Sequence, residues 1–232
     1  MLSCKRLDEM MWDLTVMMVC YIYIVTMILI SERLPFSKWI NRKFLHAMIG
    51  NLPFIMPFFT ASIYPFLVAF PFILVTFLAT PYSPVKLPGR LGALTEEGHS
   101  MGLVMYALSY STLAWFFGSK PYIVAAGILP MAYGDSTAAI LGTKFGAHRY
   151  KITESKSIEG SAGMFLGSFL SILVALLYFS HFYVFSFPNP IYPAIVIAVL
   201  TTIIEAAMPR GLDNIAVPLI GAGTFILLNS WF

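Results

Sequence analysis

One acidic residue, Asp135, lies well inside a long apolar segment and is surrounded by small side chains. It precedes the end of the segment 121–142 by seven residues, which in a helix rising ~1.5 Å per residue is a depth of about 10 Å. An ionisable group at such a depth costs about 2.5–3.5 kcal/mol on insertion scales and marks a functional site by default. An aspartate is too short to extend to water from there. We therefore predict a polar cavity or a charged partner around Asp135.

A glycine-rich, basic stretch follows Asp135. Gly142 and Gly146 bracket Lys144, and the next apolar segment opens at Lys156-Ser157-x-Glu159-Gly160. Backbone N–H groups at a helix start favour a phosphate, and lysines add mobile positive charge. A buried carboxylate beside such a loop is a usual means of holding Mg²⁺ against phosphate oxygens. Close helix packing would also explain some of the glycines, but not the acid and the bases beside them, so the stretch indicates phosphate chemistry.

A second basic cluster, Asn41-Arg42-Lys43-Phe44-Leu45-His46, opens another apolar segment. Arg42 and Lys43 could clamp the same polyphosphate. His46 follows Arg42 by one helical turn and could hydrogen-bond a phosphate or a carboxylate. A lone histidine at a helix start is, however, more often a satisfied interfacial residue. Both interpretations of His46 stay open.

Further acids flank the apolar segments on the same side. Glu205 lies near the end of its segment, and Asp213 lies in the loop beyond it. Together with Asp135 and Glu159 they place nearly all the acids that could do chemistry on one side of the membrane. The stretch Glu96-Glu97-Gly98-His99 opens another segment, and there the helix dipole explains the acids as well as a role in the site does.

Composition indicates a membrane protein. Of the 232 residues, 59% are hydrophobic and only 11% charged, whereas a soluble domain carries about 25% charged residues. Several apolar blocks approach the ~20 residues that span a bilayer as a helix. We expect an all-α, polytopic integral membrane protein with about eight transmembrane helices in a single domain over 1–232, although the proline-rich second and third could form a re-entrant hairpin. The expected helices are 11–30, 44–59, 63–80, 99–117, 121–142, 160–179, 190–207 and 214–231.

The positions of lysine and arginine predict the orientation. Eleven of the 14 fall in alternate loops, beginning with the loop between the first two expected helices, and only Lys5, Arg6 and Lys120 fall on the other side. Cytoplasmic loops retain such residues, so we expect the site on the cytoplasmic face and both termini outside. A cleavable signal peptide is the rival explanation of the first block, but the block is too long and no A-x-A site follows it.

Four motifs combine these residues: Arg42-Lys43-x-x-His46, Gly134-Asp135-x-x-Ala138-x-x-x-Gly142-x-x-x-Gly146, Lys156-Ser157-x-Glu159-Gly160, and Glu205 with Asp213-Asn214 and Pro218. Over about residues 40–220 this pattern resembles the CTP-dependent lipid kinase family, which contains dolichol, phytol and CTP-using diacylglycerol kinases. The related CDP-diacylglycerol synthases carry a longer signature with a His-Gly-Gly run. The chain lacks that run, which favours the kinases.

The resemblance implies transfer of the γ-phosphoryl group of CTP to a lipid alcohol, with Mg²⁺ or another divalent cation. The lipid would be an isoprenoid alcohol of the dolichol, polyprenol, phytol or geranylgeraniol type, or diacylglycerol. Catalytic roles are implied for Asp135, Arg42 and Lys43, and metal binding for Asp135, Glu159, Glu205 and Asp213. Nucleotide binding is implied for Arg42, Lys43, His46, Gly134, Thr137, Gly142, Lys144, Gly146, Lys156, Ser157, Glu159 and Gly160.

The expected partners are therefore a membrane lipid and a nucleotide, without nucleic acid, and a homodimer is compatible with the sequence. Two alternatives stay open. A cytidylyltransferase that makes a CDP-lipid would use the same nucleotide but transfer its α-phosphorus. A membrane transporter of a phosphorylated solute would also need buried charge, but no repeat relates the two halves of the chain.

Overall fold

The computed structural model describes residues 2–80, 82–83, 101–209 and 211–231, and it is mostly helical. The α-helices are α1 (Leu2–Arg33), α2 (Lys38–Ile49), α3 (Tyr64–Ala69), α4 (Pro71–Leu78), α6 (Gly102–Phe117), α7 (Pro121–Leu129), α8 (Asp135–Phe145), α9 (Ile158–Phe179), α10 (Ile191–Ala207) and α11 (Asp213–Trp231). Shorter turns are the 3₁₀ segments η1 (Leu52–Phe54) and η2 (Met56–Phe58) and the π-helical η3 (Pro130–Gly134). The strands are β1 (Arg149–Lys151) and β2 (Ser155–Ser157).

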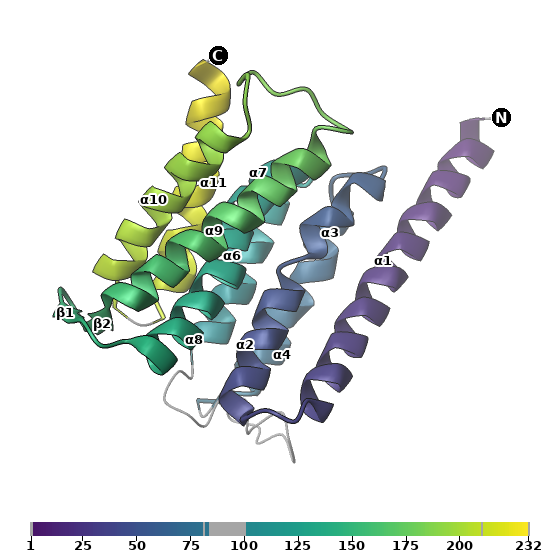
Figure 1. The fold of residues 1–232 in the computed structure, drawn as a ribbon. Coiled ribbons are helices and arrows are strands. Elements are labelled where there is room, and N and C mark those ends of the chain that lie inside the picture. The colour runs from purple at the N-terminus through teal and green to yellow at the C-terminus, as the bar shows by residue number, and fades with distance from the viewer. Residues whose placement is uncertain (1, 81, 84–100, 210, 232) are drawn as a thin grey trace.

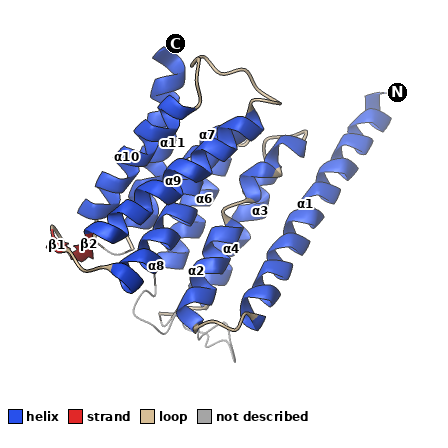
Figure 2. Ribbon diagram, in the orientation of Figure 1, coloured by secondary structure: helices blue, strands red, loops and turns tan. Residues whose placement is uncertain are grey.

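The helices run side by side in a bundle with α1 at its edge (Figure 1). Helix α9 packs against α7, α8 and α10, and α11 packs against α6, α7 and α10, while α1 contacts α2 and α3. The start of α1 and the end of α11 lie at one end of the molecule. The start of α2, the end of α8 and the antiparallel β1–β2 hairpin lie at the opposite end, called here the hairpin end (Figures 1 and 2).

Three helical stretches are long and apolar enough to cross a membrane: Lys5–Arg33, Pro121–Phe145 and Ile158–Phe179. Shorter apolar helices cover Tyr64–Leu78, Gly102–Phe117 and Ile191–Ala207. The expectation of a helical membrane protein is thus supported. The count of eight transmembrane helices and the orientation stay predictions.

The expected second helix, 44–59, is wrong as a continuous element. Helix α2 ends at Ile49 and is followed by the 3₁₀ segments η1 and η2. Each of these segments carries a proline at its start, Pro53 and Pro57. Proline lacks the backbone N–H that an α-helix needs and clashes with the preceding turn, so the chain continues in short turns.

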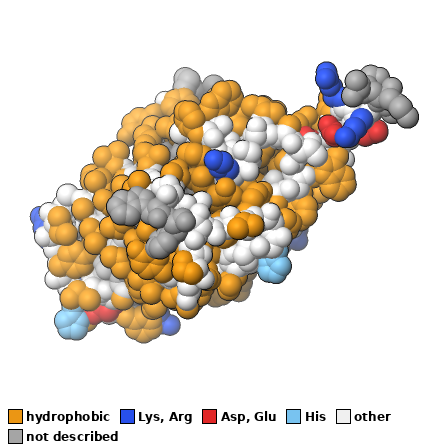
Figure 3. Space-filling model, turned by 90° about the horizontal axis from the view of Figure 1, so that it is seen from above, with side chains coloured by type: hydrophobic (Ala, Val, Ile, Leu, Met, Phe, Trp, Pro, Cys, Tyr) orange, Lys and Arg blue, Asp and Glu red, His pale blue; other side chains and the backbone are white. Residues whose placement is uncertain are grey.

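The end of the molecule that carries the termini has a mainly apolar surface (Figure 3). Exposed charged side chains lie on the first turns of α1, at Lys5, Arg6, Asp8 and Glu9, and Lys120 just before α7 is exposed as well. Apolar side chains also cover the outside of the helices, as on α9, where Leu166, Leu170 and others are exposed. An apolar outer surface of this kind suits lipid rather than water.

A buried carboxylate attaches α1 to the bundle. Asp13 is 1% exposed, and its oxygens accept hydrogen bonds from the Thr60 amide (2.6 Å), the Thr60 hydroxyl (2.7 Å) and the Ala61 amide (3.1 Å). One carboxylate thereby satisfies three donors in the turn before α3. Tyr21 and Tyr23 add hydroxyl contacts to the Leu67 and Met48 carbonyls.

We expect Asp13→Ala to destabilise the protein by about 1–3 kcal/mol, because it removes three hydrogen bonds to a buried carboxylate. The measurement is the thermal unfolding midpoint in detergent. Asp8→Ala is the matched control, because Asp8 is exposed on the same helix. Equal midpoints for the Asp13 variant and the control would show that Asp13 does not hold α1.

Candidate functional site

A break in helix geometry precedes Asp135. The helix that starts at Pro121 changes to the π-helical turn η3 at Pro130 and returns to α-helix at Asp135. Pro130 cannot donate to the carbonyl one turn earlier, so the local hydrogen-bond pattern must shift. Such turns occur frequently at functional sites. Here the turn directly precedes Asp135, the first residue of α8.

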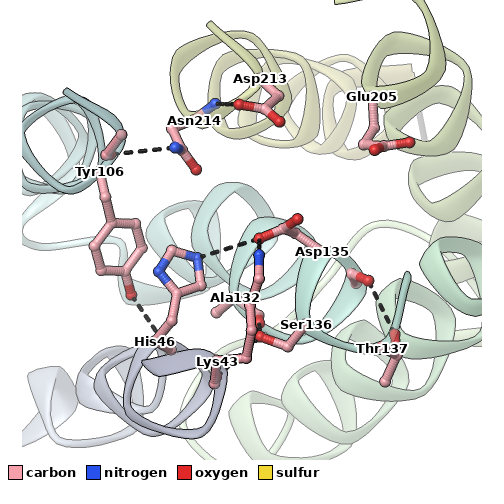
Figure 4. Close-up of polar contacts among 12 residues, drawn as sticks. Lys43, His46, Tyr106, Ala132, Asp135, Ser136, Thr137, Glu205, Asp213 and Asn214 are labelled. Atoms are coloured by element: carbon pink, nitrogen blue, oxygen red, sulfur yellow. Dashed lines mark hydrogen bonds and ion pairs between the residues drawn. The ribbon is translucent and has the colours of Figure 1, made fainter. Parts of the chain in front are cut away.

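Asp135 has the charged partner that its depth required. Lys43 Nζ lies 2.5 Å from Asp135 Oδ2, and the two side chains are only 14% and 23% exposed. The Ser136 hydroxyl donates to the Lys43 carbonyl at 3.1 Å and to the Ala132 carbonyl at 2.6 Å. Helix α2 is thereby attached to α8 at the level of the acid (Figure 4). The low exposure of both partners strengthens their attraction relative to that of a surface pair.

A second ion pair lies across from the first. Lys156, on β2, donates to Glu205 Oε1 at 2.6 Å and to the Glu205 carbonyl oxygen. The two side chains are 15% and 11% exposed. Helix α10 thereby holds the hairpin over the ends of α8 and α9. Asp135 and Glu205 face the same space in Figure 4.

A cavity of about 460 Å³ at the hairpin end contains both pairs. Most of the residues predicted for the site line it, and they come from α2, α8, the hairpin, the start of α9, the end of α10 and the start of α11. These predicted residues are Arg42, Lys43, His46, Asp135, Gly142, Lys156, Ser157, Gly160, Glu205 and Asp213.

Gly142 and Gly160 make the narrow floor of this cavity possible. A Cβ atom built on Gly142 would lie 3.2 Å from Ser157 Oγ and 3.4 Å from Gly160 Cα. Helices α8 and α9 therefore meet almost backbone to backbone. Ser157 caps α9, accepting a hydrogen bond from the Gly160 amide at 3.1 Å. The first turn of α9 thus opens on the cavity, where helix amides favour anions.

Five predicted residues do not line the cavity. Gly134 packs against Met164 on α9, and the Thr137 hydroxyl donates to the Gly163 carbonyl at 2.7 Å. Lys144 is exposed, with Nζ 5.3 Å from the centroid of the Phe145 ring. Gly146 and Glu159 complete the set: Gly146 packs under Ser157, and Glu159 pairs with His148 at 2.7 Å. Gly134 and Thr137 thus hold α8 and the turn before it against α9, and Gly146 packs against the hairpin. Lys144 and Glu159 have neither a packing role of this kind nor a place in the cavity wall.

The cavity also contains residues that the motifs did not single out, among them Trp39, Arg149 and Glu154. Trp39 precedes Arg42, Lys43 and His46 by three, four and seven residues, so it shares their helical face. That helical spacing could have predicted that Trp39 lines the site. The hairpin residues had no comparable periodic signal.

The described residues contain no group of three or more His, Cys, Asp or Glu side chains placed to hold a metal ion. Glu159 is turned away to His148. Asp135, Glu205 and Asp213 do line one cavity. One or two carboxylates suffice for Mg²⁺ that is also bound by phosphates and water, so the donor set fits a metal–nucleotide complex better than a metal bound by protein alone. Glu96, Glu97 and His99 lie outside the described residues.

The fold and the cavity define a class: a helical membrane protein with an ion-paired, basic and acidic cavity at one end of an apolar bundle. No family model matches the chain, and no solved structure matches it. Curated lipid kinases, however, are similar in sequence.

One relative is a phytol kinase of Synechocystis sp., 40% identical over 124 residues, which are 52% of each chain. A chloroplastic farnesol kinase of Arabidopsis thaliana is 27% identical over 212 residues, 86% of this chain and 68% of that one. CTP-dependent diacylglycerol kinase 1 of Schizosaccharomyces pombe is 27% identical over 151 residues, 59% of this chain and 68% of that one. The chain thus spans about half of the cyanobacterial relative. These relatives confirm the resemblance to the CTP-dependent lipid kinase family.

We expect Lys156→Met to release the hairpin, because removing one partner of a buried ion pair costs about 3–5 kcal/mol. Trypsin should then cleave after Arg149 and Lys151 about tenfold faster or more, since cleavage follows the open population. The fragments are quantified by mass spectrometry. Lys144→Met removes a neighbouring trypsin site without breaking an ion pair and should cleave like the wild type. Equal rates for both variants would show that the Lys156–Glu205 pair does not hold the hairpin.

Proposed function

We propose that this protein is a lipid-alcohol kinase that transfers the γ-phosphoryl group of CTP to the hydroxyl of an isoprenoid alcohol. The observation that carries the proposal is the cavity itself: a largely buried Lys43–Asp135 pair faces a largely buried Lys156–Glu205 pair at the end of an apolar helical bundle. A soluble nucleotide reaches such a cavity from the aqueous side, and a lipid reaches it from the membrane. The names of the relatives, which are lipid kinases, support the same reaction.

Phosphoryl transfer needs positioning and charge neutralisation more than covalent chemistry by the protein. Arg42, Lys43 and Lys156 would neutralise the phosphates, and the amides at the start of α9 would add partial positive charge. The hydroxyl oxygen of the lipid forms a bond to the γ-phosphorus as the bond from that phosphorus to the β,γ-bridging oxygen breaks. A base lining the cavity takes up the hydroxyl proton, and the products are the lipid phosphate and CDP.

Asp135 would hold a divalent cation, assisted by Glu205 or Asp213. When bound, Mg²⁺ supplies charge neutralisation between the phosphate oxygens and these carboxylates. In the structure Lys43 neutralises Asp135. Its flexible side chain can follow the phosphates once they enter.

For the substrate we propose a short isoprenoid alcohol of the phytol or farnesol type rather than dolichol, because phytol and farnesol kinases are among the relatives. We also propose that the hairpin end faces the cytoplasm, with both termini outside. The excess of lysine and arginine in the loops at the hairpin end supports this orientation.

Asp135→Asn should lower kcat/KM by about 100-fold or more, the usual effect of removing one preorganised electrostatic group from an active site. The measurement is transfer of radiolabel from [γ-³²P]CTP to farnesol in detergent micelles, with the unfolding midpoint confirming that the variant is folded. Asp8→Asn makes the same substitution at an exposed position on α1 and should keep full activity. A fully active Asp135→Asn enzyme would remove Asp135 from the reaction.

A cytidylyltransferase would use the same cavity and the same nucleotide, but it would leave the α-phosphorus on the lipid. Parallel assays with [α-³²P]CTP and [γ-³²P]CTP separate the two reactions. We expect only the γ label in the lipid product, at one label per molecule. Transfer of the α label would replace the kinase with a CDP-lipid synthase.

A further inference from the structure

A second, apolar pocket adjoins the polar cavity. Its volume is about 140 Å³, and its walls come mainly from α1, α2, α4 and α6. Val75, on α4, is 42% exposed, while Ile28 on α1 and Phe72 on α4 are half-buried. The pocket therefore reaches the apolar outer surface of the bundle near α4. A hydrocarbon chain could enter it from the membrane without crossing water.

The apolar pocket and the polar cavity share part of their wall. Arg42, His46 and Leu103 line both. An elongated molecule with one polar end could therefore lie with its chain in the apolar pocket and its polar group in the cavity. That is the shape of a lipid alcohol.

His46 stands at this shared wall with an unpaired ring nitrogen. Its ring packs on Tyr106, with centroids 4.3 Å apart, and lies between Tyr106 and Asp135 in Figure 4. Nε2 is buried and has no hydrogen-bond partner among the described residues. It lies 4.0 Å from Asp135 Oδ2, beyond hydrogen-bond distance. An unsatisfied buried polar atom is costly and rare, so a ligand group is a natural partner for it.

Either tautomer of a neutral imidazole offers a donor or an acceptor at Nε2, and a hydroxyl group can both donate and accept a hydrogen bond. A hydroxyl is therefore a suitable partner for His46 Nε2.

We propose that the apolar pocket holds the part of the chain next to the hydroxyl of a single-chain isoprenoid alcohol and that this hydroxyl hydrogen-bonds His46 Nε2. The inference rests on the kinase activity proposed above and places His46 against the lipid hydroxyl rather than against the nucleotide. The hydrogen bond orients the hydroxyl oxygen toward the γ-phosphorus, and the proton passes to a base lining the cavity, as in the reaction above. A pocket of about 140 Å³ is close in size to a cavity that binds benzene, so it suits the first few carbons of one chain, and diacylglycerol, with two chains, should be a poor substrate.

The first test removes the ring nitrogens and keeps an aromatic ring. His46→Phe should lower kcat/KM for farnesol about 100-fold, as misplacement of a reacting group by about 1 Å does. Binding of [α-³²P]CTP, measured by equilibrium dialysis, should stay at the wild-type value. Loss of CTP binding in this variant would return His46 to the nucleotide site, and unchanged turnover would remove it from the hydroxyl, so either result overturns the proposal.

The second test fills the apolar pocket. Ala107, which is buried and lines the pocket, becomes leucine, and the control is Ala162→Leu at an exposed position on α9. Ala107→Leu should lower kcat/KM for geranylgeraniol about tenfold or more, since added methylene groups in an apolar site act on this scale, with the KM for CTP unchanged. An unchanged kcat/KM for geranylgeraniol in Ala107→Leu would overturn the assignment of this pocket to the lipid chain. A preference of the wild type for diacylglycerol would overturn it as well.

A third measurement does not depend on turnover. A farnesol analogue with a diazirine a few carbons from the hydroxyl should crosslink to the α1, α4 or α6 walls of the pocket, and Ala107→Leu should reduce the labelling. Crosslinking at the pocket by a wild-type protein that transfers no γ label would refute the kinase proposal alone. Turnover of farnesol with labelling confined to other surfaces would refute the pocket alone.

Discussion

The electrostatic cost of burying a carboxylate in an apolar bundle constrains the arrangement around it. Asp135 can be kept ionised at its depth only beside a compensating charge, and Lys43 supplies it at 2.5 Å from 92 residues earlier in the chain. The pair requires α2 to pack against α8, and the Ser136 hydroxyl holds the Lys43 carbonyl at the same level. The N-terminal part of the chain is thus fixed to the rest of the bundle by the interaction that defines the site.

The same constraint shapes the other wall of the cavity. Lys156 and Glu205 are 49 residues apart, and their contact closes the hairpin over α10. With the Gly142–Gly160 approach between α8 and α9, the two pairs enclose a polar space whose apolar neighbour shares the His46 wall. The proposed reaction between a charged nucleotide and a lipid needs an aqueous environment and an apolar environment directly beside each other. The bundle provides these two environments by placing the polar cavity and the apolar pocket next to each other along α2.

The sequence alone was sufficient to predict the features that follow from the free-energy cost of burying a charge. Asp135 was predictable because a buried acid is expensive, and the helical spacing of the α2 bases was enough to group them. It was insufficient where partners are distant or local geometry is irregular. Asp13 lies two residues after the start of the first expected helix, where a charged residue at the membrane–water boundary is ordinary. In the structure it binds the turn at Thr60 instead. The three-residue strands carry no period to read, and the π-turn at Pro130 follows from a proline in an otherwise ordinary helix.

The charges of the cavity favour a metal–nucleotide complex over a bare anion. Its described lining contains equal numbers of basic and acidic side chains, so their formal charges cancel. A free triphosphate would meet as many repelling carboxylates as attracting bases, which removes the general attraction that a purely basic cleft provides. A divalent cation changes the balance, because it lets carboxylates and phosphate oxygens share one ion. The charged side chains in that lining are Arg42, Lys43, Arg149 and Lys156 against Asp135, Glu154, Glu205 and Asp213.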